Sequence, residues 1–183
     1  MIEAKLEAQI LKSLSESGVG GNDFGGLWQA DKEEKADDAV IVRCVVNPLT
    51  YVDGKIYKSN VEIALAVRKE CDTEGTLFST NCKKLSDVLN DWQTNYKSVS
   101  DSISIDEFKV CPQIITGTDG NVEITSSPVY NLTTEADWDG NLDASIFKCT
   151  FTLCGVIVTG NPRVTPVILR FGVFGKEPKI QQQ

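Results

Sequence analysis

Hydrophobic residues recur at every fourth position at the beginning of the chain, at Ile2, Leu6, Ile10 and Leu14. Charged and amide side chains occupy most of the positions between them. A spacing close to 3.6 residues is typical of an amphipathic helix that turns one stripe toward a core. We therefore expect this segment to form a helix that ends at Gly18 and packs its narrow stripe against another element.

Two adjacent segments then carry the patterns of β-strands. Residues 39–47 (AVIVRCVVN) form a nearly continuous β-branched run, which is typical of a strand buried on both faces. Asp53-Gly54 lies between β-forming residues and predicts a hairpin turn. Beyond it, alternate apolar residues from Val61 to Val67 share one face of a strand that we expect to reach Arg68.

A second helix is predicted after these strands. Its apolar positions are separated by four, three, four and three residues, which places them on one face. Thr76 is expected to cap its N-terminus, and the preceding strands are its expected packing partner. The apolar positions are Phe78, Cys82, Leu85, Leu89 and Trp92.

The last third of the chain predicts four further strands, at 108–115, 122–125, 147–158 and 164–174. A turn at residues 118–121 should join the first two. The last two alternate apolar with polar residues on either side of Gly160-Asn161-Pro162, so we expect them to pair as antiparallel neighbours.

Two segments fall outside this regular pattern. Residues 18–37 contain five glycines followed by a run of mixed charges, which predicts a mobile loop. Residues 176–183 predict a flexible C-terminal tail. We expect residues 1–175 to form a single α/β domain. Its expected fold class is α+β, with a mixed, mostly antiparallel sheet on which the N-terminal helix and the central amphipathic helix pack.

The composition argues against nucleic-acid and membrane partners. The chain has 183 residues and a formal net charge of −8, and its Lys and Arg residues are dispersed, whereas phosphate contacts need them clustered. We therefore expect no specific nucleic-acid binding. Acidity ordinarily serves solubility, with a negatively charged channel wall past which DNA slides as the alternative. Because no run of about 18 apolar residues occurs, we also expect no membrane partner.

Most catalytic and metal-binding arrangements need residues that this chain lacks. It has no histidine, and its six cysteines include no CxxC pair, so neither a Ser-His-Asp triad nor a usual zinc site is available. Without a signal peptide the thiols should be reduced, and Cys44, Cys82, Cys149 and Cys154 lie in apolar patterns typical of buried positions. We expect no catalytic residues, cofactor or metal ligands.

Two sets of acidic residues leave carboxylate catalysis and cation binding as alternatives. Glu62, Glu70, Asp72 and Glu74 are the one local set of carboxylates from which a glycosidase-like site could be built. The segment Asp137–Asp143 alternates oxygen side chains as a calcium loop does, but its glycine stands fourth and an EF-hand would need its glutamate where Lys148 stands. An acidic surface turn is the favoured interpretation, and cation binding there stays open.

The order of expected elements resembles that of the tail-terminator or tail-completion proteins of long-tailed phages. It comprises the N-terminal helix, a buried strand, the Asp53-Gly54 hairpin, an alternating strand, the second helix and the long strand 147–158, and it covers about two thirds of the chain. The glycine-rich insertion, an acidic loop expected at residues 133–143 and the strand 164–174 enlarge the family's usual domain.

The resemblance implies a non-enzymatic virion protein, assembled in the host cytoplasm and placed in the phage tail or neck. It implies a homohexameric ring that caps the tail tube, ends tube polymerisation and docks to the head-tail connector. Other interpretations are a different neck or tail tube subunit, a small carboxylate-dependent enzyme, and a monomeric ligand-binding domain with an apolar pocket.

Overall fold

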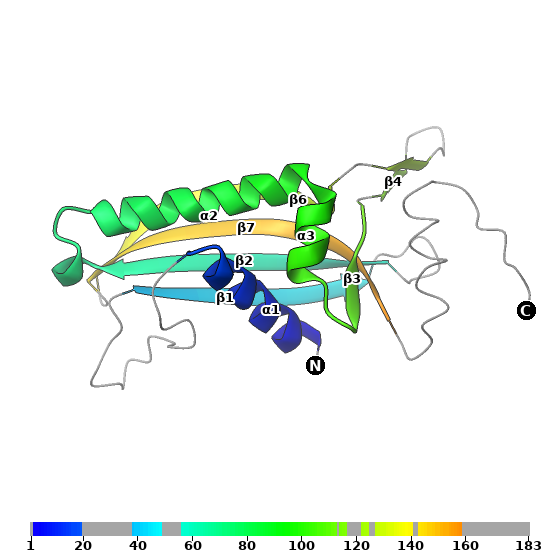
Figure 1. The fold of residues 1–183 in the computed structure, drawn as a ribbon, viewed down its shortest axis with the longest axis horizontal. Helices are drawn as coiled ribbons and strands as arrows, with labels where there is room; N and C mark the ends of the chain where they lie inside the picture. Colours follow the sequence, from blue (N-terminus) through cyan, green and yellow to red (C-terminus); the bar gives the residue numbers. More distant parts are fainter. Residues whose placement is uncertain are drawn as a thin grey trace, which may run out of the picture.

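The computed structural model describes residues 2–19, 38–48, 56–112, 114–116, 122–124, 127–140 and 143–158. Within them a long, twisted sheet carries three helices on one face (Figure 1). The elements in chain order are α1 (Ile2–Glu16), β1 (Asp38–Pro48), β2 (Ile56–Arg68), the 3-10 turn η1 (Lys69–Cys71), α2 (Thr76–Thr94), α3 (Tyr96–Ile103), β3 (Phe108–Val110), β4 (Ile114–Thr116), β5 (Val122–Ile124), β6 (Val129–Asp139) and β7 (Ala144–Ile157).

The main sheet is built around β7, its longest strand. Its strand order is β1-β2-β7-β3, and β6 pairs with β7 on the same side as β3. Strands β4 and β5 form a separate hairpin. Every described strand pair is antiparallel, so the predicted α+β fold, with its mostly antiparallel sheet and two packed helices, is confirmed.

The stripe of α1 packs on the inner face of the sheet as predicted, with Leu6, Ile10 and Leu14 fully buried. The helix ends in a left-handed cap, because Gly18 has φ +76° and its N–H donates to the Ser15 carbonyl at 2.9 Å. The N–H of Val19 donates to the Leu14 carbonyl at 2.9 Å, which completes a Schellman motif. Gly18 and buried Val19 therefore belong to the folded domain, and the loop predicted over 18–37 begins too early; residues 20–37 lie outside the described residues.

The predicted face of α2 is confirmed at Leu85, Leu89 and Trp92, which are buried against the sheet. The ring of Trp92 packs edge-to-face on that of Phe151 of β7, with 6.4 Å between the ring centroids. Phe78 and Cys82, nearer the N-terminus of the helix, are half-buried.

The predicted cap at Thr76 is wrong. The helix starts at Thr76, and the carboxylate of Asp72 accepts the N–H groups of Leu77 (3.0 Å) and Phe78 (2.8 Å). A charged acceptor that reaches two free amides replaces the hydroxyl cap.

Strand β1 pairs with β2 along its whole length, from Asp38 opposite Val67 to Pro48 opposite Tyr57, which confirms the pairing predicted from the hairpin signal; the turn itself lies outside the described residues. The expectation that this strand is buried on both faces is wrong. Val40 and Val42 point into the core, but Val45 is 57% exposed. The reason is position: β1 is the last described strand on its side of the sheet.

Two predictions for the C-terminal half are also wrong. Residues 129–139, expected to include an acidic loop over 133–143, form strand β6, because the segment pairs with β7 from Val129 to Asp139. Strand β7 itself confirms the long strand predicted at 147–158 and begins three residues earlier, at Ala144. The strand predicted at 164–174 lies outside the described residues, but its expected pairing with 147–158 is wrong, because β2 pairs with one edge of β7 and β6 and β3 pair with the other.

The strand predicted at 108–115 is divided into β3 and β4, with Pro112, which lacks an N–H, between them. The strand predicted at 122–125 is confirmed as β5, paired with β4. Helix α3 was not predicted; Asn95 caps it by accepting the Ser98 N–H at 3.2 Å, and Val99 and Ile103 are its buried residues.

Candidate assembly interface

The outer face of the sheet is covered by none of the described helices, all of which pack on the inner face. Directly opposed residues share a face in an antiparallel sheet, so the register places one row across this outer surface: Arg43, Glu62, Thr150 and Thr133. A hollow of about 420 Å³ lies over this part of the face, lined by Arg43, Val45, Asn60, Val61, Glu62, Asn131, Thr150, Phe151 and Thr152.

A β-bulge shapes one wall of this hollow. Tyr130 pairs with Thr152 and Thr133 with Thr150, so two residues of β6 oppose a single residue of β7. The extra residue is accommodated at Asn131, whose φ of 56° lies in the left-handed region that asparagine tolerates. The hydroxyl groups of Thr133 and Thr150 hydrogen bond to each other beyond the bulge. The outer face is therefore polar and irregular here.

A second groove of about 580 Å³ follows the outer edge of β1 and is walled by α1. Ala4 and Ala8 leave it wide because their side chains are short, and Leu11 adds an apolar wall. The carboxylate of Glu7 accepts the backbone N–H of Cys44 at 2.9 Å, which shows that this amide points away from β2. Among the described strands, only β2 pairs with β1.

The direction of the Cys44 amide fixes the direction of the other peptide groups in the sheet. Because ladder hydrogen bonds alternate along antiparallel strands, the even-numbered residues of β1 turn their backbone groups toward the open edge. Following the register through β2 and β7, the even-numbered residues of β6 do the same at the opposite edge. Trp138 fits this pattern, since its N–H donates to Asp137 at 2.7 Å rather than to β7.

The carboxylates considered for catalysis do not converge. Glu62 lies on the outer face within β2, six residues before the end of the strand, a separation of roughly 20 Å. Glu70 pairs with Arg68, and Asp72 caps α2. Glu74 is exposed. Glu70 and Asp72 therefore serve local structure at one end of the sheet.

The segment Asp137–Asp143 spans the end of β6 and the turn into β7. Trp138 is 46% exposed, and the ammonium of Lys69 lies 5.7 Å from the centre of its ring. The Asp143 carbonyl accepts the Lys69 N–H at 2.9 Å. In the part of the chain that the structure describes, no group of three His, Cys, Asp or Glu side chains is placed to hold a metal ion; residues 141 and 142 lie outside that part.

The cysteines lie in distinct environments. Cys44, Cys149 and Cys154 are buried as predicted, whereas Cys82 is half-buried. Burial raises the pKa of the Cys44 and Cys149 thiols to about 12, reinforced at Cys44 by the Glu7 carboxylate and at Cys149 by Cys82, and burial raises the pKa of Cys82 to about 11. Thiols with such high pKa values are poor nucleophiles.

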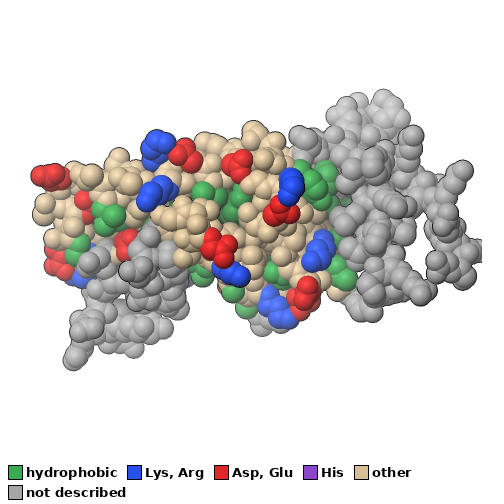
Figure 2. Space-filling model, viewed as in Figure 1, with side chains coloured by type: hydrophobic (Ala, Val, Ile, Leu, Met, Phe, Trp, Pro, Cys, Tyr) green, Lys and Arg blue, Asp and Glu red, His purple; other side chains and the backbone are tan. Residues whose placement is uncertain are grey.

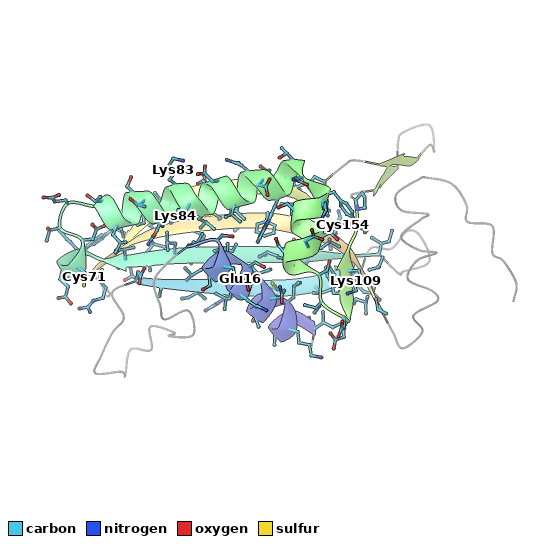
Figure 3. All side chains as sticks on the ribbon, viewed as in Figure 1. Glu16, Cys71, Lys83, Lys84, Lys109 and Cys154 are labelled. Carbon is cyan, nitrogen blue, oxygen red and sulfur yellow. The ribbon has the colours of Figure 1, made fainter. Side chains whose placement is uncertain are left out.

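Buried Cys111 and Cys154 bring their sulfur atoms within 3.5 Å. Their hydrogen bond, together with burial, raises the pKa of Cys111. Exposed Cys71 lies at the opposite end of the sheet from Cys154 (Figure 3).

Basic side chains on the helical face are interspersed with acidic ones (Figure 2). Lys83 and Lys84 on α2 lie apart from Lys109 on β3 (Figure 3), and Lys83 is paired with Asp87 at 2.8 Å. Further ion pairs join Lys5 to Glu107, Lys12 to Glu16 and Lys97 to Asp101. No helix among the described residues is long and apolar enough to cross a bilayer.

Comparison of the sequence with protein-family models and with curated proteins found no match in either set. The open surfaces were not predicted from the sequence, which indicated that β1 is a fully buried strand. The exposed charge at Arg43 within a β-branched run is the one sequence signal that could have shown that the outer face of this strand is open.

Proposed function

We propose that this chain is a non-enzymatic structural protein of a long-tailed phage virion, similar to tail terminators. In this role copies of it form a ring that caps the tail tube, ends tube polymerisation and offers a surface to the head-tail connector. The order of α1, the β1–β2 pair, α2 and the late strand β7, which underlies the resemblance to that family, supports the proposal.

The observation that carries the proposal is the sheet, which within the described residues has one face that no helix covers and an edge on each side that no further strand pairs with. The described helices all pack on the inner face of the sheet. The outer face is polar and hollowed, and Val45 is exposed at the rim of the hollow. Such surfaces suit contacts with other protein subunits. An enzyme that uses carboxylates is less well supported, because Glu62 lies far from Glu70 and Asp72.

The experiment is to add the purified chain to polymerising tail tube protein and to measure tube lengths by negative-stain electron microscopy. We expect short tubes of narrow length distribution with extra density at one end, and an unrelated acidic protein of similar size should leave lengths unchanged. Density distributed along the whole tube would favour a tube subunit instead. Unchanged tubes with bare ends would contradict the proposal.

A further inference from the structure

Among the strands that the structure describes, β1 and β6 each have one unpaired edge, and these two edges have complementary properties. We propose that copies of this chain join edge to edge, with β1 of one copy pairing antiparallel with β6 of the next. The inference rests on the proposed function, because that function requires copies of the chain to assemble, and it names the surfaces that they use. The occupant of the β1 edge is therefore a second copy of this chain.

Strand direction is the first argument. Strands β1 and β7 run one way, and β2 and β6 run the other way, because each neighbouring pair is antiparallel. A second copy placed beside the first in the same orientation thus offers β6 to β1 with antiparallel direction. The helices of both copies then lie on the same face. Since the two edges differ, the contact is head-to-tail, which is the kind of contact that a closed ring repeats from one copy to the next.

The backbone groups of both edges suit this pairing. On β1 the backbone groups of Val40, Val42 and Val46 point outward, and the amide of Cys44 between them is bonded to Glu7. On β6 the backbone groups that point outward belong to Thr134, Ala136 and Trp138. Even-numbered residues face outward at both edges, so Val42 and Ala136 can form a hydrogen-bonded pair of a new ladder, whereas the Cys44 amide stays bonded to Glu7 and the Trp138 N–H must leave the Asp137 carboxylate to take part. The bulge at Asn131 limits the ladder at one end of β6.

Charge distinguishes this pairing from the two like-with-like alternatives. Arg43 is the exposed charge on the outer face of β1, and it forms no ion pair among the described residues. On the same face of β6, Glu135 and Asp137 are exposed; within each copy Lys148 of β7 lies opposite Glu135, and Glu62 of β2 lies opposite Arg43. Two β6 edges would bring four carboxylates together and two β1 edges would bring two guanidinium groups together, whereas β1 with β6 joins opposite charges.

The register follows from the same residues. If Val42 pairs with Ala136, then Arg43 stands directly opposite Glu135 on the outer face and diagonal to Asp137. This is a non-hydrogen-bonded pair, with Cα atoms about 4.5 Å apart, which lets the two side chains reach each other. Val45 is then opposite Thr133, so its exposed methyl groups become covered.

Charge reversal tests the contact in the full-length chain by sedimentation velocity at low salt. Arg43→Glu should raise the subunit dissociation constant by on the order of tenfold or more, and so should Glu135→Lys with Asp137→Lys. Combining all three substitutions restores opposite charges and should return the constant to near the wild-type value. Matched controls with the same changes in charge on α2 are Lys83→Glu and Asp87→Lys with Asp91→Lys, which should leave assembly intact.

A proline at the β6 edge tests the backbone contribution. Ala136 is exposed and its N–H points away from β7, so Ala136→Pro removes no internal ladder bond. We expect circular dichroism like that of the wild type and loss of assembly, while Ala136→Ser should assemble normally.

The outcomes separate this inference from the proposed function. Assembly that survives both charge reversals and the proline substitution overturns edge pairing and leaves the proposed function standing. Loss of assembly in both reversals without recovery in the combined variant overturns the Arg43–Glu135 register. A wild-type chain that stays monomeric, both alone and with tail tubes, overturns the inference and the proposed function together.

Discussion

Leu85→Ala tests the packing of α2 on the sheet. Leu85 is fully buried within the core that α1, α2, α3 and the inner face of the sheet share. The substitution removes three buried carbon atoms, which costs about 2.4 kcal/mol at roughly 0.8 kcal/mol each. The cavity left behind adds to this, and measured costs of such truncations lie at about 2 to 5 kcal/mol.

The assay is urea unfolding followed by circular dichroism, at a protein concentration too low for assembly. With a slope of about 2 kcal/mol per molar urea, the midpoint should fall by more than about 1 M. Leu77→Ala on the same helix is the control; its side chain is 37% exposed, so its cost should stay below about 1 kcal/mol. A stable Leu85→Ala variant that has lost only assembly would show that this face is an interface and not core.

Further predictions concern Gly155, the thiols and DNA. Gly155→Ala should destabilise the domain by about 1 to 3 kcal/mol in the same assay, because a Cβ there would lie 2.3 Å from Cζ of Phe108 and 2.7 Å from the Lys109 carbonyl oxygen; an unchanged midpoint would refute this close approach. In the native protein at pH 8, a thiol reagent should label exposed Cys71 first, and rapid labelling of all six cysteines would contradict the described burial. Burial raises the pKa of Cys44 and Cys149 to about 12, so between about pH 9 and 12 the unfolded chain loses thiol protons that the folded chain keeps. The free energy of unfolding should therefore fall as pH rises through this range. Cys149→Ala should make this fall less steep, and a slope identical to that of the wild type would refute the assignment. Fluorescence anisotropy with a labelled duplex at about 0.15 M salt, where charges are screened beyond roughly 8 Å, should show no binding; micromolar binding that weakens steeply with salt would reveal a basic patch.

Local periodicity was sufficient to predict the elements with one buried face. The stripe of α1 and the alternation from Val61 to Val67 each repeat along a continuous segment, so a short window of sequence contains the whole signal. The second helix was predicted for the same reason, although its capping residue was not. Asp72 lies four residues before Thr76, and its carboxylate reaches forward to the amides of Leu77 and Phe78, a geometry that adjacent-residue capping rules do not include.

The environment of a strand depends on its neighbours, which the sequence of that strand does not specify. Residues 39–47 are β-branched as a central strand would be, yet β1 has a neighbour on one side only among the described strands. Segment 129–139 is polar and acidic as a loop would be, yet it pairs with β7. Both departures lie at the outermost strands of the described sheet, where exposure and pairing are decided by tertiary contacts, and the edges of these strands are the candidate interface.

The molar mass of the purified chain in solution, measured by multi-angle light scattering alone and after incubation with tail tubes, tests the central claim of self-assembly most directly. One chain has a mass of 20.0 kDa. The proposed hexameric ring predicts a species of about 120 kDa, either for the chain alone or for material released from capped tubes. A mass of one chain at every concentration, together with no association with the tubes, would contradict the account.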